Sequence, residues 1–132
     1  MKKEFIPYEQ ALALKELGFN DPCFGWFTDG HLRIGAVVEN KHVQGEGELL
    51  APTFSQAFRW FREKYNLRGF IGFRPNVKQF DCHVYDMSLS GKEYVKQRTM
   101  EEFNKDPLVG TYEEAELACL IKLIEIVKGG NK

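Results

Sequence analysis

Apolar residues recur along the chain with two periods, and these periods predict helices and hairpins. Residues 8–17, "YEQALALKEL", stand between Pro7 and Gly18, as in a short helix that begins at a proline and ends before a glycine. A second helix is predicted over residues 54–65, after Pro52 and a capping pair formed by Thr53 and Gln56. Its predicted core side, read at 100° per residue, is Phe54, Ala57, Phe58, Phe61 and Tyr65.

The longest predicted helix lies near the C-terminus. Thr111 and Glu114 are spaced as a capping box, and the apolar period then continues over residues 112–128 to a glycine pair. Its predicted core side is Tyr112, Ala115, Cys119, Leu120, Leu123, Ile126 and Val127. Ile121 lies outside this wide apolar side, so either another helix or a second copy of the chain in a homodimer would cover the remainder.

Two segments alternate with the period of a strand and contain turn residues. Residues 23–28 and 31–38 flank Asp29–Gly30, which is a strong hairpin signal between aromatic and β-branched runs. Residues 70–73 and 79–87 flank a turn around Pro75–Asn76 and predict a second hairpin. The alternation predicts two core faces, namely Leu32, Ile34, Ala36 and Val38 in the first hairpin, and Phe80, Cys82 and Val84 in the second.

The remaining segments are less regular. Residues 39–48 are polar and rich in glycine, which predicts a loop, and residues 90–104 predict a peripheral helix that ends before Asp106–Pro107. Tight hairpins make antiparallel sheets, and helices of this strength cover one face of such a sheet. The sequence therefore predicts one α+β domain over residues 1–132, with two layers in which an antiparallel sheet of two hairpins packs against three or four helices.

Composition narrows the class of protein. A chain of 132 residues with 43% hydrophobic and 14% aromatic residues builds a core without disulfides or metals. Cys23, Cys82 and Cys119 are odd in number and widely spaced, which favours reduced thiols in a cytoplasmic protein. The N-terminus lacks the apolar stretch of a signal peptide, and Lys122 and Glu125 interrupt the apolar C-terminal helix, so we expect no membrane partner.

Candidate chemistry is sparse. The sequence contains none of the common nucleotide-binding, hydrolase, metalloprotease or calcium motifs, and its three histidines have no metal-ligand spacing, so we expect no cofactor and no metal. Asp81, His83 and Tyr85 share one face of a predicted strand, where they form either an acid–base cluster or an ordinary solvated surface. Glu116 lies within the apolar side of the last helix, where a carboxylate is costly unless it is paired or reaches water.

A basic segment is the clearest departure from an even charge distribution. Residues 59–78 carry six cations against the single carboxylate of Glu63, whereas the whole chain has a net charge of −1. Such a segment suits either contact with nucleic-acid phosphates, with exposed rings such as Phe70 or Phe73 stacking on bases, or the solvated side of a core helix. The candidate residues are Arg59, Trp60, Arg62, Lys64, Arg68, Arg74 and Lys78.

Four stretches carry a resemblance to a known family: "YEQALALKELGF", "DPCFGWF", "LLAPTFSQAFRWFREKYNL" and "TYEEAELACLIKLIEIVK". In these stretches, which make up roughly half of the chain, the sequence resembles small uncharacterised proteins encoded by phages and prophages of Bacteroides-type bacteria. The resemblance implies a mobile-element protein that works inside a bacterial host, with residues 68–110 as its variable part. A variable segment on a constant scaffold favours a non-enzymatic binding or interaction module, with a protein or nucleic acid as its partner.

Overall fold

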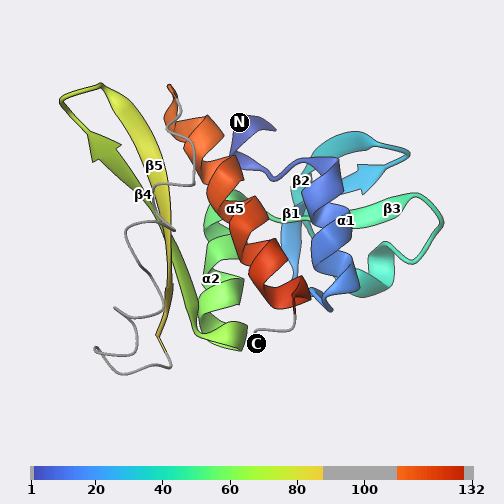
Figure 1. Ribbon diagram of the computed structural model, residues 1–132. Coiled ribbons are helices and arrows are strands. Elements are labelled where there is room, and N and C mark those ends of the chain that lie inside the picture. The colour runs from blue at the N-terminus through green and yellow to red at the C-terminus, as the bar shows by residue number, and fades with distance from the viewer. Residues whose placement is uncertain (1, 88–109, 130–132) are drawn as a thin grey trace. The chain divides into compact units, whose positions relative to one another are not determined.

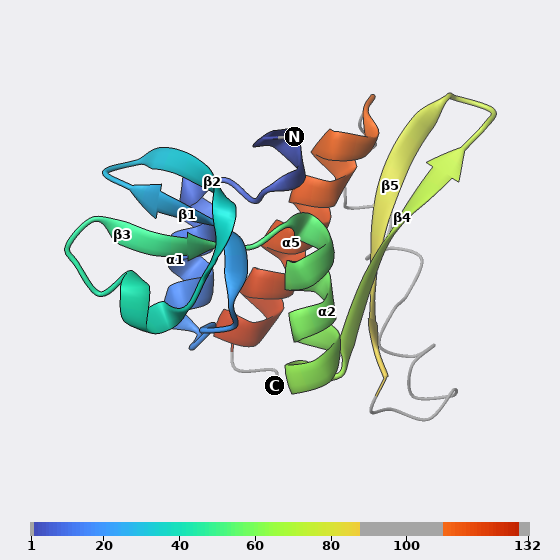
Figure 2. The same ribbon diagram turned by 180° about the vertical axis from the view of Figure 1, so that it is seen from behind.

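The computed structural model describes residues 2–87 and 110–129, and the helix predicted over residues 90–104 lies outside them. The chain divides into two compact units, Met1–Ala57 and Phe58–Lys132. Figures 1 and 2 give two views of the elements. The prediction of an α+β fold with antiparallel strands and helices is confirmed. That the two units form one domain stays a prediction.

The first unit contains a three-stranded antiparallel sheet in the order β2-β1-β3. Strands β1 (Cys23–Thr28) and β2 (His31–Val38) form the predicted hairpin, and both turn residues, Asp29 and Gly30, have the positive φ that a tight turn of this kind requires. Strand β3 (Glu48–Ala51) pairs with the other edge of β1. The sequence predicted a loop over residues 39–48, which includes the first residue of this strand. The loop is therefore shorter than predicted, and the first hairpin belongs to a larger sheet.

Helix α1 (Tyr8–Glu16) contacts β3 and ends as its sequence predicts. Gly18 adopts a φ of 100°, and the backbone N–H of Phe19 donates to the carbonyl of Leu14 over 2.9 Å. These are the features of a glycine-terminated helix with an apolar residue after the glycine. Short 3-10 turns cover Lys2–Glu4 and Asn40–His42.

The predicted core face of β2 is only partly correct. Val38 is buried, and Leu32 and Ile34 are half-buried, but Ala36 is exposed. The register between β1 and β2 shifts between Cys23 and Gly25, and Gly35 has a φ of 137°. This bulge ends the simple alternation of the strand, which explains why a period of two residues misplaced Ala36.

Helix α2 (Phe54–Tyr65) begins in the first unit, and most of it belongs to the second. The Thr53 hydroxyl accepts from the N–H of Gln56 over 3.1 Å, as the predicted cap requires, whereas the Gln56 side chain donates to the carbonyl of Pro22 over 2.7 Å. The predicted core side is largely confirmed, with Tyr65 half-buried. The buried residues are Phe54, Ala57, Phe58, Trp60 and Phe61.

The second unit contains a separate two-stranded sheet, β4 (Leu67–Arg74) and β5 (Gln79–Asp86), and the helix α5 (Tyr112–Lys128). The two predicted hairpins thus lie in two sheets rather than in one. Helix α5 contacts both strands of the second hairpin. A Cβ atom added to Gly69 would lie 2.7 Å from the Cys119 sulfur, so this glycine allows the close approach of helix and strand.

The predicted core side of helix α5 is confirmed in part. Ala115, Cys119, Leu120 and Leu123 are buried as expected. Ile126 and Val127 are only half-buried, and Ile124 is buried although it was not predicted to be. Tyr112, which was predicted to be in the core, is instead 48% exposed at the first position of the helix. Periodicity alone does not show where the opposing sheet stops.

Candidate functional site

The candidate residues Asp81, His83 and Tyr85 lie on the face of the β4–β5 hairpin opposite Cys82 and Val84. Of the predicted core face of β5, Cys82 and Val84 are buried and Phe80 is half-buried. Asp81, His83 and Tyr85 alternate with these residues, as predicted. The pairing register places Gly72 opposite Asp81, Phe70 opposite His83 and Arg68 opposite Tyr85. We call this side of the hairpin, with Arg68, Phe70, Gly72, Arg74, Gln79, Asp81, His83 and Tyr85, the polar face.

Asp81 is the centre of the polar face and is only 6% exposed. Its Oδ2 accepts a hydrogen bond from Arg74 Nε over 2.9 Å, and its Oδ1 lies 2.9 Å from His83 Nε2. Space for the carboxylate comes from Gly72, because a Cβ atom there would collide with Asp81 Oδ1. A buried carboxylate held by a guanidinium and an imidazole is stabilised by charge-assisted hydrogen bonds.

Three aromatic rings continue the polar face from Asp81. The ring of Phe70 stacks on His83 at 4.9 Å between centroids and on Tyr85 at 5.0 Å. Stacking and the hydrogen bond to Asp81 together hold the His83 ring in one orientation. A carboxylate that orients an imidazole is an arrangement used in general acid–base catalysis. Asp81 and His83 have this arrangement, but His83 Nδ1, the nitrogen that would exchange a proton with a substrate, is buried. Tyr85 joins them through ring contact.

The residues of the basic segment are spread over several elements. Arg59, Trp60, Arg62 and Lys64 are on α2, Arg68 and Arg74 on β4, and Lys78 in the turn before β5. Three of the cations have local contacts. Arg59 Nε lies 3.9 Å from Glu63, Lys64 lies over the Trp60 ring at 5.2 Å, and Arg74 binds Asp81.

Trp60 is buried, with 6% of its surface exposed. Its ring makes edge contacts with Phe61 at 5.1 Å and with Tyr65 at 5.5 Å. An indole packed in this way does not offer a face to a nucleic-acid base. Phe73, which is 51% exposed, is the better placed ring, whereas Phe70 is engaged on the polar face.

Binding of nucleic acid through the basic segment stays a prediction that a titration at two salt concentrations tests. If Arg62, Arg68 and Lys78 contact phosphates, affinity for a labelled single-stranded oligonucleotide should fall about tenfold or more between 50 and 200 mM salt. Fluorescence anisotropy measures this change, and Arg33→Gln in the first unit is the control. No binding at low salt, or equal losses for Arg68→Gln and Arg33→Gln, would exclude this use of the segment.

A second surface lies at the turn end of the β4–β5 hairpin, on the side of the hairpin that contacts α5 and next to the first residue of that helix. Phe80 contacts Phe73 at 4.9 Å between ring centroids, and it meets the Tyr112 ring edge-on at 5.9 Å. Phe73 and Tyr112 are about half exposed, and we call these three rings the aromatic surface. This surface was not predicted from the sequence, although two aromatic residues placed opposite each other next to a turn are a recognisable signal.

Glu116 lies one helical turn after Tyr112. Among the described residues it makes no hydrogen bond or ion pair. Partial burial and then the nearby Glu113 carboxylate raise the pKa of Glu116 above its ordinary value of 4.5. Burial also raises the pKa of Tyr112, with Glu116 as the next cause.

The raised pKa of Glu116 predicts a direction for the effect of pH on stability. Because the folded state binds this proton more tightly than the unfolded state, stability from this group is present at low pH and is lost as pH rises through the raised pKa. Glu116→Gln should therefore stabilise the protein at pH 7 and lose this advantage below pH 4.5. Urea denaturation at both pH values measures the difference, with Glu125→Gln on the exposed side of α5 as the control. Equal effects at both pH values would contradict the prediction.

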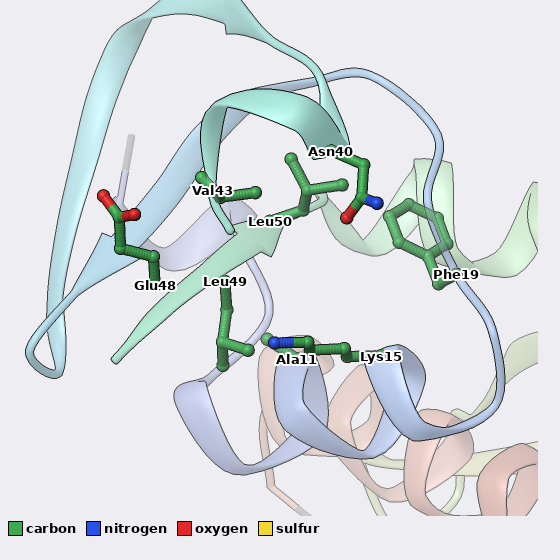
Figure 3. A pocket seen from close by; sticks show the side chains of 8 residues that line it. All are labelled: Ala11, Lys15, Phe19, Asn40, Val43, Glu48, Leu49 and Leu50. Carbon is green, nitrogen blue, oxygen red and sulfur yellow. The ribbon is translucent and has the colours of Figure 1, made fainter. Parts of the chain in front are cut away.

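Figure 3 shows a small cavity of the first unit from close by. Its volume is about 10 Å³, and its lining combines Lys15, Asn40 and Glu48 with the apolar residues Ala11, Phe19, Val43, Leu49 and Leu50. Such a space holds about one water molecule. In the same unit, burial raises the pKa of the Cys23 thiol to about 12, so this cysteine stays protonated at neutral pH.

Among residues 2–87 and 110–129, no three His, Cys, Asp or Glu side chains are grouped to hold a metal ion. Within the same residues, no helix combines the length and the apolar character needed to cross a membrane. Comparisons with family models, with curated proteins and with solved structures find no significant match to this chain.

Proposed function

We propose that the protein is a non-enzymatic binding module, encoded by a bacterial mobile element, that contacts a protein partner through the aromatic surface. The observation that carries this proposal is the exposure of Phe73 and Tyr112, which are 51% and 48% accessible and are linked through Phe80. Phenylalanine and tyrosine are enriched in the cores of protein interfaces. The resemblance to phage and prophage proteins supports the bacterial setting.

The energetics of these rings favour a partner. Full burial of a phenylalanine side chain stabilises by about 1.5–3 kcal/mol, so covering a half-exposed ring contributes on the order of 1 kcal/mol. The rings are held in place by their contacts with Phe80, so little side-chain freedom is lost on binding. A rigid aromatic cluster of this kind is a suitable anchor for an interface.

Site-specific photo-crosslinking in a bacterial host tests the proposal. A photoreactive phenylalanine analogue at position 73 or 112 should give a discrete adduct with a partner protein. The same analogue at position 24, where Phe24 is 63% exposed in the first unit, is the matched control and should give none. Adducts from position 24 alone, or from all three positions equally, would contradict a role for the aromatic surface.

A second candidate function is acid–base catalysis on the polar face. The contact of 2.9 Å between His83 Nε2 and the buried Asp81 supports it, because the carboxylate fixes the orientation of the imidazole. Hydrolysis of an activated ester, p-nitrophenyl acetate, gives a direct comparison of variants. His83→Gln should lower the rate while His31→Gln, an exposed histidine on β2, leaves it unchanged. Equal rates for both variants would remove this candidate.

A further inference from the structure

We propose that the aromatic surface recognises a lysine or arginine side chain, flanked by apolar residues, in its protein partner, with Glu116 as the counter-charge. This inference rests on the proposed function, and it adds the chemistry of the partner. The elements that form the site are the turn end of the β4–β5 hairpin and the first two turns of α5, all within the second unit.

The rings supply the first part of the recognition. The Phe80 ring is inclined by 50° to Phe73 and by 89° to Tyr112, so the three rings face different directions. A cation is attracted to the face of an aromatic ring, and the attraction grows when water is excluded. The exposed parts of Phe73 and Tyr112 allow a side chain with an aliphatic stem and a charged end to lie against them.

Glu116 supplies the second part. It follows the first turn of α5, where Glu113 and Glu114 lie, and the favourable effect of the helix N-terminus on a carboxylate fades beyond that turn. The carboxylate is partly withdrawn from water and lies near the Glu113 carboxylate, which contributes to its raised pKa, and near Tyr112. A cation placed between Glu116 and the Tyr112 ring would relieve this unfavourable setting.

The charges at the Tyr112 end of the aromatic surface favour one class of partner. There Glu113 and Glu116 repel an acidic peptide or a nucleic-acid phosphate, whereas the cations at the other end are Arg74, which is bound to Asp81, and Lys78 in the turn. An uncharged apolar segment would cover the rings and leave the Glu116 carboxylate further from water. A basic residue between apolar neighbours satisfies both the rings and the carboxylate. Charge complementarity therefore favours this class of partner.

Selection of peptides from a random decapeptide display library tests the inference with the full chain. Selection on the wild-type protein, with counter-selection on Tyr112→Ser, should enrich peptides with lysine or arginine between apolar residues. Both Tyr112→Ser and Phe73→Ser replace half-exposed rings, so they should fold, and they should fail to bind the selected peptides. Phe24→Ser is the matched control and should bind them as the wild type does.

The contribution of the Glu116 charge to binding is measured in a separate experiment. Replacing the lysine of the best peptide with glutamine should weaken binding to the wild type by about tenfold or more, and to Glu116→Gln by less than about threefold. Glu125→Gln should keep the full difference. Enrichment of uncharged peptides, or an undiminished difference on Glu116→Gln, would overturn the inference and leave the proposed function standing.

Two further outcomes would reject the inference, and the first of them would also reject the proposed function. If no peptide is enriched over the Tyr112→Ser background, both the inference and the proposed function fail. If light scattering shows a dimer of the wild type that Tyr112→Ser converts to a monomer, a second copy of the chain occupies the surface, and the inference of a basic partner segment is wrong.

Discussion

Replacing Leu123 with alanine should lower the free energy of unfolding by about 2–5 kcal/mol, because it removes a fully buried side chain from the core of the second unit. Leu123 packs close to β4, because a Cβ atom added to Gly69 would be 3.1 Å from its Cδ1. A two-stranded hairpin is marginal by itself and depends on what packs against it. Urea denaturation followed by circular dichroism measures the loss.

Ile121 offers a matched control on the same helix. It is 36% exposed, so Ile121→Ala should change the free energy of unfolding by no more than about 0.5 kcal/mol. Equal losses for the two variants would contradict the burial pattern of α5. Such a result would instead indicate that Ile121 is buried in an interface, as a homodimer would require.

The helices could be predicted because their signals are local. Thr111 caps α5 by accepting a hydrogen bond from the N–H of Glu114 over 3.1 Å. Gly18 follows the end of α1 with a positive φ. The spacing of these residues in the sequence indicates both features. Helix caps and the helical period of 3.6 residues depend on residues within a few positions of one another, so both can be recognised directly in the sequence. The same holds for the tight turn at Asp29–Gly30.

Strand β3 could not be predicted in the same way. It is four residues long, follows a polar glycine-rich segment and ends before Pro52, so its local pattern is too short to separate from a loop. What makes it a strand is its pairing with β1. Such pairing is a long-range property, as is the division of the two hairpins between two sheets.

The candidate site could be predicted only where it depends on a local pattern. Alternation along β5 was enough to place Asp81 and His83 on one face, whereas the recruitment of Arg74 depends on the register of β4 against β5. The burial of Trp60 was missed because the residue stands at the border of the apolar side of α2. The side on which a border residue packs is decided by tertiary contacts rather than by helical period.

Gly72→Ala should destabilise the second unit by about 1–3 kcal/mol, the usual cost of forcing extra atoms into a filled site. The added Cβ atom would collide with Asp81 Oδ1 and lie 3.0 Å from His83 Nε2. Asp81 has little freedom to move, because it is buried and held by Arg74 and His83. Urea denaturation measures the loss, and ¹⁵N NMR of the His83 ring reports the change in its hydrogen bond.

The cause of this loss can be isolated with a double-mutant cycle. Gly110→Ala is the matched control, because a Cβ atom there meets nothing within 4 Å. If the collision with the carboxylate is responsible, Gly72→Ala should cost much less in an Asp81→Ala background, since the shortened side chain leaves room for the added methyl group. An unchanged cost in that background would mean that the backbone of β4 itself requires glycine. In that case Gly72 would serve the hairpin rather than the polar face.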